Sequence, residues 1–293
     1  MLGECVMMQR RMATTGGAMH TIGVLYNPLA PATAQAGERI AAWLGERGLS
    51  VWLGTSQSAR DEPEKVAPCQ LMLALGGDGT VLRAARIGIT YNMPILGVAM
   101  GHLSFMAEVT EESVYEGLEV LLNGGGWYDQ RTLVRARVLR QGQEIFNDLA
   151  LNEVLLSRRD VARVVHVSVA IDDMPLTSYR ADGVLVSTAT GSTAYALAAG
   201  GPVLDPRSDS LLLVTVAGHL TSLPALVLPP DTKITWTLAR HHPTIISLDG
   251  QWSFPIEPDD LIEVTRAQEI CRFAHVYPQA HFYQSLTQRL RRQ

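Results

Sequence analysis

A glycine-rich turn built around one carboxylate is the part of this sequence best suited to chemistry. Residues 76–80 read Gly-Gly-Asp-Gly-Thr and directly follow the apolar run 71–75. Glycine permits a positive φ and has no Cβ, so the backbone of such a turn can approach a ligand closely. A helix is expected to start near Thr80, and its free N–H groups would favour an anion. Asp78 would repel a phosphate, so it indicates a general base, a metal ligand or an acceptor for a ribose hydroxyl.

The same turn also has a purely structural interpretation, because Asp-Gly and Gly-Gly are common turn dipeptides. Two other short segments are open to the same pair of interpretations. Asn152-Glu153 offers an amide and a carboxylate side by side, suited to an adenine edge and to ribose hydroxyls, but such a pair is also common on surfaces. Residues 248–251 read Leu-Asp-Gly-Gln, which by itself predicts an ordinary hairpin.

Residues 179–202 form the richest segment. A buried strand leads into Thr-Gly-Ser-Thr at 190–193, and a helix of small residues is expected to follow. The hydroxyls and the free N–H groups at that helix start would make a second anion site, although Ser and Thr before a helix also serve as simple N-caps. Tyr195 could stack on a base.

Taken together, these four segments resemble the NAD kinase family in order and approximate spacing, from about Thr21 to at least Gln251. The glycine-aspartate turn is shared with diacylglycerol and sphingosine kinases and with phosphofructokinases. The run 190–195, Thr-Gly-Ser-Thr-Ala-Tyr, is the specific one.

The resemblance implies that the chain transfers the γ-phosphate of ATP, or a phosphoryl group of polyphosphate, to the adenosine 2′-hydroxyl of NAD. Asp78 matches the catalytic base. Mg²⁺ or another divalent cation would bridge the donor phosphates, and the resemblance names no side chain as its ligand. The family commonly forms homodimers or homotetramers. The residues expected to contact substrates are Asp78, Gly79, Arg83 (phosphate), Phe105 (base), Asn152, Glu153, Arg163, Arg180, Asp182, Thr193, Ala194, Tyr195, Ala196, Leu197, Ala198 and Gln251.

Three departures from the family pattern leave the fine substrate preference open. Residues 99–105 lack the family's usual Asn at Ala99 and Gly at Ser104, although Phe105 remains. Residues 215–219 keep only His219 of the usual Pro-Ile-x-Pro-His, and Ala198 replaces a common serine. The choices between ATP and polyphosphate and between NAD and NADH therefore stay open.

The elements that must position these residues change character along the chain. Strands expected at 21–26, 51–53, 71–75 and 94–98 alternate with helices at 36–47, 81–87 and 110–122, which predicts a Rossmann-like parallel sheet with Asp78 beyond a strand's carboxyl end. Short alternating strands follow, at 131–140, 144–150, 165–171, 211–216, 234–238, 245–248 and 261–264, as in an antiparallel sandwich. We expect a disordered lead over 1–20, an α/β domain over 21–125 to which the tail 266–293 returns, and a β-sandwich NAD-binding domain over 126–265.

Composition excludes several classes of protein. The 293 residues carry a net charge of −5, which disfavours nucleic-acid binding, and no apolar run is long enough to span a bilayer. Three widely spaced cysteines argue against a disulfide framework and favour the cytoplasm. The only lysines, Lys65 and Lys233, lie outside any glycine-rich loop, so there is no Walker-type phosphate lysine.

Two alternatives to an NAD kinase remain at this point. One is a lipid or sugar kinase that shares the glycine-aspartate turn. The other is a non-catalytic dinucleotide sensor, which is suggested by the departures from the family pattern near Ala99 and Ala217.

Overall fold

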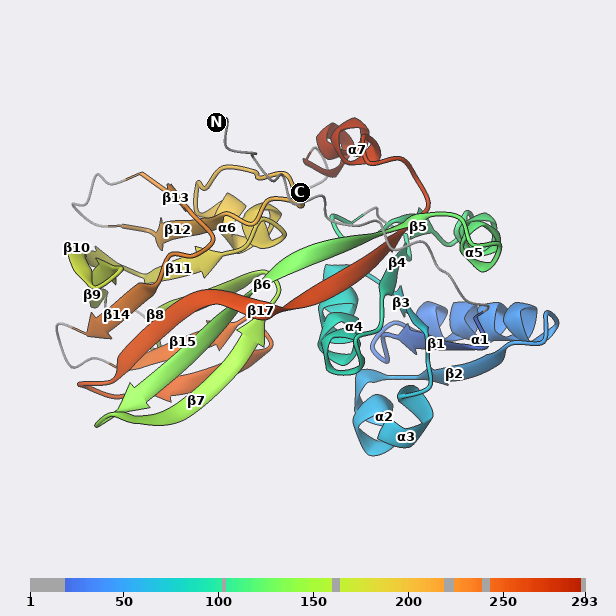
Figure 1. The fold of residues 1–293 in the computed structure, drawn as a ribbon, viewed down its shortest axis with the longest axis horizontal. Coiled ribbons are helices and arrows are strands. Elements are labelled where there is room, and N and C mark those ends of the chain that lie inside the picture. The colour runs from blue at the N-terminus through green and yellow to red at the C-terminus, as the bar shows by residue number, and fades with distance from the viewer. Residues whose placement is uncertain (1–18, 102–103, 160–163, 219–223, 239–242, 291–293) are drawn as a thin grey trace, which may run out of the picture. The chain divides into compact units, whose positions relative to one another are not determined.

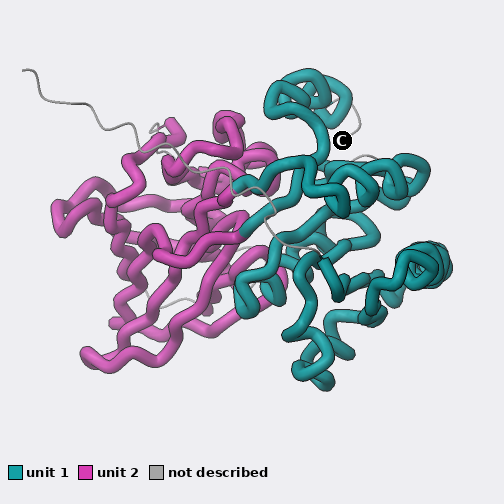
Figure 2. Tube along the Cα trace, turned by 45° about the vertical axis from the view of Figure 1, so that its right-hand side comes forward, with its two compact units in different colours: residues 1–129, 272–293 teal, residues 130–271 magenta. Residues whose placement is uncertain are grey.

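The computed structural model describes residues 19–101, 104–159, 164–218, 224–238 and 243–290. The predicted site residue Arg163 and the motif residue His219 lie outside the described residues, as does the expected lead up to residue 18. The chain divides into two compact units, Met1–Asp129 with Arg272–Gln293, and Gln130–Cys271 (Figure 2).

The first unit is built on a parallel sheet in the order β2-β1-β3-β4 (Figure 1). Both β3 and β4 are buried along their whole length, as the apolar runs predict for strands covered on both faces. The strands are β1 (Thr21–Tyr26), β2 (Ser50–Gly54), β3 (Leu71–Leu75), β4 (Ile95–Ala99) and the short β5 (Val109–Thr110). The helices are α1 (Pro31–Gly45), α2 (Ser56–Asp61), α3 (Pro63–Val66), α4 (Asp78–Tyr91), α5 (Val114–Leu122) and α7 (His281–Leu290).

Three helix starts differ from the prediction, each for a local reason. Helix α1 begins at Pro31, five residues earlier than expected, because the fixed φ of proline suits the first helical position. Helix α4 begins at Asp78, not near Thr80, so the carboxylate belongs to its first turn. The helix predicted from 110 begins only at Val114, because Thr110 pairs in β5 and its N–H bonds to the Ser113 hydroxyl at 3.0 Å.

The second unit is an antiparallel β-sandwich, as predicted. One sheet has the order β13-β12-β11-β8-β15-β16, and the other runs β10-β9-β14-β17 with β6 beside β17 and β7 beside β6. Valines and leucines from both inner faces, together with Trp236, form one buried cluster. The strands are β6 (Trp127–Arg140), β7 (Gln143–Ala150), β8 (Glu153–Arg158), β9 (Val165–Ile171), β10 (Met174–Ala181), β11 (Gly183–Ser187), β12 (Leu211–Val216), β13 (Leu226–Leu228), β14 (Ile234–Leu238), β15 (Thr244–Leu248), β16 (Trp252–Ile256) and β17 (Leu261–His275), with the short helices η1 (Gly191–Thr193) and α6 (Tyr195–Ala198).

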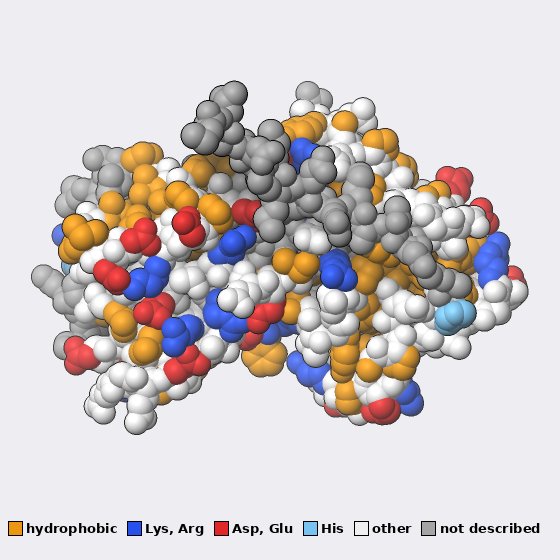
Figure 3. Space-filling model, in the orientation of Figure 1, with side chains coloured by type: hydrophobic (Ala, Val, Ile, Leu, Met, Phe, Trp, Pro, Cys, Tyr) orange, Lys and Arg blue, Asp and Glu red, His pale blue; other side chains and the backbone are white. Residues whose placement is uncertain are grey.

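The outer face of β6, β7 and β17 carries charges of both signs (Figure 3). Arg137 pairs with Glu144 and Glu263, and Arg135 pairs with Glu269. Alternation of these residues with the buried ones explains why β6 reads as a half-buried strand.

No helix among the described residues is both long and apolar enough to cross a membrane.

Candidate active site

Asp78 lies where the chain leaves β3 and enters α4. Its Oδ1 accepts the N–H of Met106 at 2.9 Å, and its Oδ2 accepts the N–H of Phe105 at 3.3 Å. The side chain is half-buried. The two N–H donors therefore fix the rotation of the carboxylate, while each oxygen keeps a second lone pair for a ligand.

The three glycines of this turn are needed for different reasons. Gly76 has φ +153°, and a Cβ there would lie 2.5 Å from the Thr80 hydroxyl, so the fold itself requires glycine. Around Gly77 there is nothing within 4 Å of such a Cβ, and around Gly79 only the Arg83 guanidinium at 4.0 Å. Both are exposed. Packing does not explain these two glycines, whereas close approach of a ligand would.

Arg83 lies one turn further along α4 and is exposed. Its Nη1 donates to the carbonyl of Gly79 at 3.3 Å, which keeps the guanidinium beside the turn. The structure thus brings Asp78, Gly79, Arg83 and the backbone of Phe105 together.

In the second unit, the Asp249 side chain joins two of the predicted segments. Its carboxylate accepts the N–H groups of Leu151, Asn152 and Glu153 at 2.9, 2.7 and 3.1 Å. Asp249 lies in the β15–β16 turn, with φ +53°. The sequence predicts the hairpin correctly but not this function of its carboxylate, because a bond between a side chain and a distant backbone leaves no local pattern.

The 187–191 turn packs on the same Asn152 backbone. The carbonyl of Asn152 accepts the Ser187 hydroxyl at 3.0 Å and the N–H of Thr188 at 2.9 Å. A Cβ on Gly191 would lie 2.2 Å from that carbonyl oxygen, so only glycine fits there. Glu153 begins β8, and Asn152 directly precedes that strand.

The hydroxyls of Ser192 and Thr193 bond to the backbone of the turn itself. Ser192 Oγ donates to the carbonyl of Ala189 at 2.7 Å and accepts the N–H of Leu204 at 2.9 Å. Thr193 Oγ1 donates to the carbonyl of Thr190 at 3.2 Å. The hydroxyls stabilise the turn, because burial requires each of them to find a partner.

Two buried polar atoms beside this turn have no hydrogen-bond partner among the described residues, namely Oδ1 of Asn152 and Oε2 of Glu153. Their residues are 5% and 8% exposed. Burial and, to a lesser extent, the nearby Asp249 carboxylate raise the pKa of Glu153 to about 8, against the opposing effect of the Tyr195 N–H. An amide oxygen and a carboxyl oxygen left bare in this way are the acceptors that a polar ligand would satisfy.

The remaining predicted residues lie in varied settings. Both oxygens of Asp182 bond to Arg158, at 2.9 and 3.0 Å, while Arg180 is exposed. The Tyr195 side chain is 42% exposed, so a face of its ring is available for stacking. The N–H of Gln251 closes the 248–251 turn on the carbonyl of Leu248 at 3.0 Å. Of the other small residues in this run, Ala196 is buried, Ala194 and Leu197 are half-buried and Ala198 is exposed.

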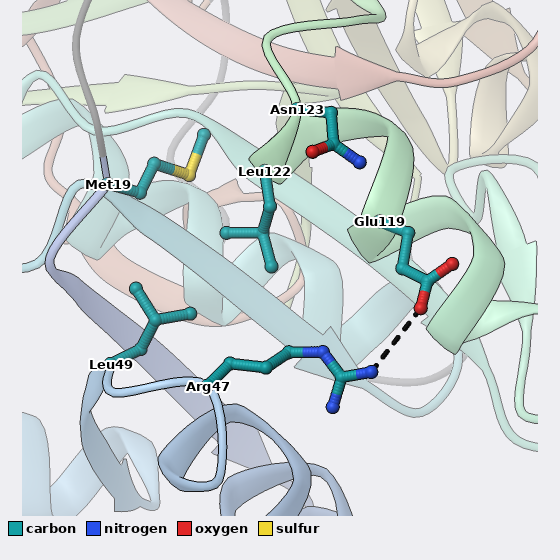
Figure 4. Close-up of a pocket in the computed structure, with 6 residues that line it drawn as sticks. All are labelled: Met19, Arg47, Leu49, Glu119, Leu122 and Asn123. Atoms are coloured by element: carbon teal, nitrogen blue, oxygen red, sulfur yellow. Dashed lines mark hydrogen bonds and ion pairs between the residues drawn. The ribbon is translucent and has the colours of Figure 1, made fainter.

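A hollow of about 490 Å³ in the first unit contains none of the predicted site residues (Figure 4). An ion pair between Arg47 and Glu119, 3.3 Å apart, lies on its wall. The Arg47 guanidinium also stacks on the Trp43 ring, 3.5 Å from its centre, so this arginine is held by its own surroundings.

An α/β unit with a carboxylate at a helix start and a sandwich with unpartnered buried acceptors are the two candidate binding regions of this chain. Models of the ATP-NAD kinase N-terminal and C-terminal domains match residues 58–126 and 151–276. The NAD kinase of Chloroflexus aggregans is 51% identical over 274 residues, which cover 94% of this chain and 99% of that protein. The NAD kinase of Dehalococcoides mccartyi is 37% identical and covers 92% of this chain and 95% of its own length. The chain belongs to the NAD kinase family.

Solved structures show the same fold. Yeast NADH kinase complexed with NADH aligns with a TM-score of 0.84 at 21% identity, covering 94% of this chain and 88% of that one. An NAD kinase from Archaeoglobus fulgidus in complex with ATP aligns with a TM-score of 0.70, also at 21% identity, covering 92% and 98%. Both predicted domain types, the parallel α/β sheet and the antiparallel sandwich, are thereby confirmed.

Proposed function

We propose a division of labour for the reaction of this NAD kinase, the phosphorylation of NAD to NADP. Asp78 acts as the general base on the adenosine 2′-hydroxyl, and the Asn152–Glu153 pair holds the dinucleotide. The pair of bare, buried acceptors on Asn152 and Glu153 is the observation that carries the binding role.

The proposed role of Asp78 follows from what the reaction lacks. A ribose hydroxyl is a poor nucleophile at neutral pH, and a well-placed base is worth about 10²- to 10⁴-fold. Asp78 is held by the N–H groups of Phe105 and Met106 with lone pairs to spare. It can therefore accept the hydroxyl proton as the oxygen bonds to the terminal phosphorus of the donor, while the bond from that phosphorus to the bridging oxygen breaks and releases the shortened donor, ADP in the case of ATP.

The negative charge of the donor phosphates must be neutralised by groups other than a Walker-type lysine, because neither lysine lies in a glycine-rich loop. The open space beside Gly77 and Gly79 lets phosphate oxygens approach the start of α4, and Arg83 adds a cation. The described residues contain no group of three or more His, Cys, Asp or Glu side chains that could hold a metal. Mg²⁺ is commonly bound through substrate phosphates and only one or two carboxylates, and Asp78 is the carboxylate of this turn. When bound, the cation would neutralise charge on the donor.

Recognition of the dinucleotide is assigned to the bare acceptors. Asn152 Oδ1 can accept from the adenine amino group, and Glu153 Oε2 from a ribose hydroxyl or that amino group. Asp249 supports both residues by fixing their backbone. The exposed Tyr195 ring and the Phe105 side chain are proposed to stack on bases, and Gly79, Arg163, Arg180, Asp182, Thr193, Ala194, Ala196, Leu197, Ala198 and Gln251 complete the proposed contacts.

The substitution Asp78→Asn tests the base, because the amide keeps the size of the carboxylate but is a far weaker proton acceptor. We expect turnover to fall by at least about 10²-fold, with a Kd for NAD within threefold of the original by calorimetry. Asp61→Asn, at the end of α2, is the matched control and should retain full activity. Full turnover by Asp78→Asn would refute the role of Asp78.

Three further proposals complete this function. The phosphoryl donor is ATP or polyphosphate with Mg²⁺ or another divalent cation, the enzyme works as a homodimer or homotetramer, and its location is the cytoplasm. An NADP-formation assay across donors and metals, with sedimentation of the active species, tests the first two.

A further inference from the structure

The backbone that meets Asp78 is held from its other side by an arginine of helix α7. The carbonyls of Phe105 and Ala107 accept from Nη1 and Nη2 of Arg289, at 2.6 and 3.1 Å. Arg289 is only 6% exposed. Phe105 thus gives its N–H to Asp78 and its carbonyl to Arg289, and so links the two side chains.

The same segment is fixed further along by its neighbours in the sheet. The carboxylate of Glu108 accepts the N–H groups of Val276 and Tyr277, both at 2.9 Å. The N–H of Glu108 bonds to the carbonyl of Gly97 at 2.9 Å, and a Cβ on Gly97 would lie 2.4 Å from the carbonyl oxygen of Met106. These contacts fix the segment 105–108 at Glu108. Arg289 instead bonds to Phe105, whose N–H donates to Asp78.

The chemistry of arginine suits this position. Its planar guanidinium presents several N–H groups in a fixed fork, so one side chain can bond two carbonyls that face the same way. A lysine carries three N–H donors on a single tetrahedral nitrogen and so lacks the fixed planar fork that holds both carbonyls in one arrangement. Helix α7 is itself tied at its start, where the His281 ring packs on Tyr277 with ring centres 4.6 Å apart.

We propose that Arg289 is a positioning residue for phosphoryl transfer, which sets the orientation of the Asp78 carboxylate through the backbone of Phe105 and Met106. The proposal rests on the role given to Asp78 under the proposed function. A base must point its lone pair at the hydroxyl within a narrow range, and a misplacement of about 1 Å can lower the rate by roughly 10²-fold. Losing the Arg289 fork would free the carbonyl side of Phe105 and let the two N–H donors of Asp78 move.

The test compares Arg289→Met, which removes the fork but keeps much of the buried volume, with Arg289→Lys, which keeps the charge. We expect kcat to fall by roughly 10- to 100-fold in Arg289→Met, while the KM for NAD stays within threefold. The kcat of Arg289→Lys should lie between those of Arg289→Met and the unaltered enzyme. If Arg289→Met does not fold, Arg289→Lys is used as the only test variant. Gln288→Met, an exposed neighbour on α7, is the matched control and should behave as the unaltered enzyme.

A double variant separates this proposal from the role of Asp78. If Arg289 acts through Asp78, then Asp78→Asn with Arg289→Met should be no slower than Asp78→Asn alone. The positioning role would be overturned if the two single reductions in kcat multiplied in the double variant. It would also be overturned if a folded Arg289→Met or Arg289→Lys kept the full kcat while Asp78→Asn had lost most of its turnover. A fully active Asp78→Asn would instead show that the proposed base is wrong.

Discussion

Replacing Glu153 by glutamine should make this protein more stable at neutral pH and a poorer binder of NAD. The Glu153 carboxyl is 8% exposed, its Oε2 has no partner among the described residues, and Asp249 adds a like charge. These conditions suit a bound ligand and penalise the ionised carboxylate in the free protein. Glutamine keeps the shape and removes the charge.

The magnitude follows from the pKa of about 8 in the folded protein against 4.5 for an ordinary glutamate. A raised pKa means that the folded state binds the extra proton, so stability falls as pH rises from about 4.5 to about 8. Between pH 6 and pH 8 the penalty grows by about 2 kcal/mol. Glutamine does not titrate, so the advantage of Glu153→Gln should widen by that amount over this range.

Thermal unfolding at pH 6 and pH 8 measures this directly. The gap in Tm between Glu153→Gln and the unaltered protein should widen by roughly 4–8 °C, taking the usual conversion for a domain of this size. Above pH 8, where Glu153 is ionised, the Kd for NAD should be roughly tenfold higher for Glu153→Gln, since a charge-assisted hydrogen bond is replaced by a neutral one. Glu38→Gln, on an exposed position of α1, is the control and should show neither change. A gap in Tm that does not depend on pH would refute the burial argument, and an unchanged Kd would refute ligation by Glu153.

Two further predictions concern residues that support the site. Asp249→Ala leaves the N–H groups of residues 151–153 without this acceptor and should lower the free energy of unfolding by about 3–5 kcal/mol. Chemical denaturation measures this free energy. Asp259→Ala is the control, because Asp259 also has a positive φ. Gly76→Ala should destabilise the protein by roughly 1–3 kcal/mol because of the positive φ at this position and the nearby Thr80 hydroxyl. Gly77→Ala should leave stability unchanged and lower turnover at least about tenfold. The same denaturation assay measures stability, and NADP formation measures turnover.

Each of these predictions has an outcome that contradicts it. Equal stabilities of Asp249→Ala and Asp259→Ala would show that the three N–H bonds contribute little. Normal turnover by a folded Gly77→Ala would mean that the open space beside this glycine is not used by the donor.

Much of the fold was predictable because its signals are local. The apolar runs at 71–75 and 94–98 correctly indicate buried strands of a parallel sheet, since such strands are covered on both faces. Strand β17 was predicted only over 261–264, although it continues to His275. Its later half breaks the alternation, because Gln268 and Glu269 are both exposed and Phe273 and Ala274 are both buried, so it lacks the period-two pattern of a strand. Helix α7 was not predicted either; the residues that it buries are the polar Ser285 and Arg289, which do not mark a core-facing side in a sequence.

The site was predictable in its residue types but not in its connections. Asp78, Asn152 and Glu153 stand out because polar residues beside glycines or apolar runs are conspicuous in a sequence. The bonds from Asp249 to residues 151–153 and from Arg289 to 105–107 join a side chain to a distant backbone. A backbone group looks the same at every position, so no residue type reveals such a partner. For the same reason the inward-facing Ser192 hydroxyl could not be told from a ligand-facing one.

The link between Phe105 and Arg289 also has a consequence for the order in which the protein matures. The two residues are separated by 184 positions, and chains are synthesised at about 5–20 residues per second, so the Phe105 carbonyl waits roughly 10–40 s for its partner. Residues 130–271, which form one compact unit, are complete before Arg289 is made. The unit that was begun first therefore cannot close this contact until almost the whole chain has been made. The backbone that orients the Asp78 carboxylate should therefore become fully fixed only after synthesis of the chain is complete.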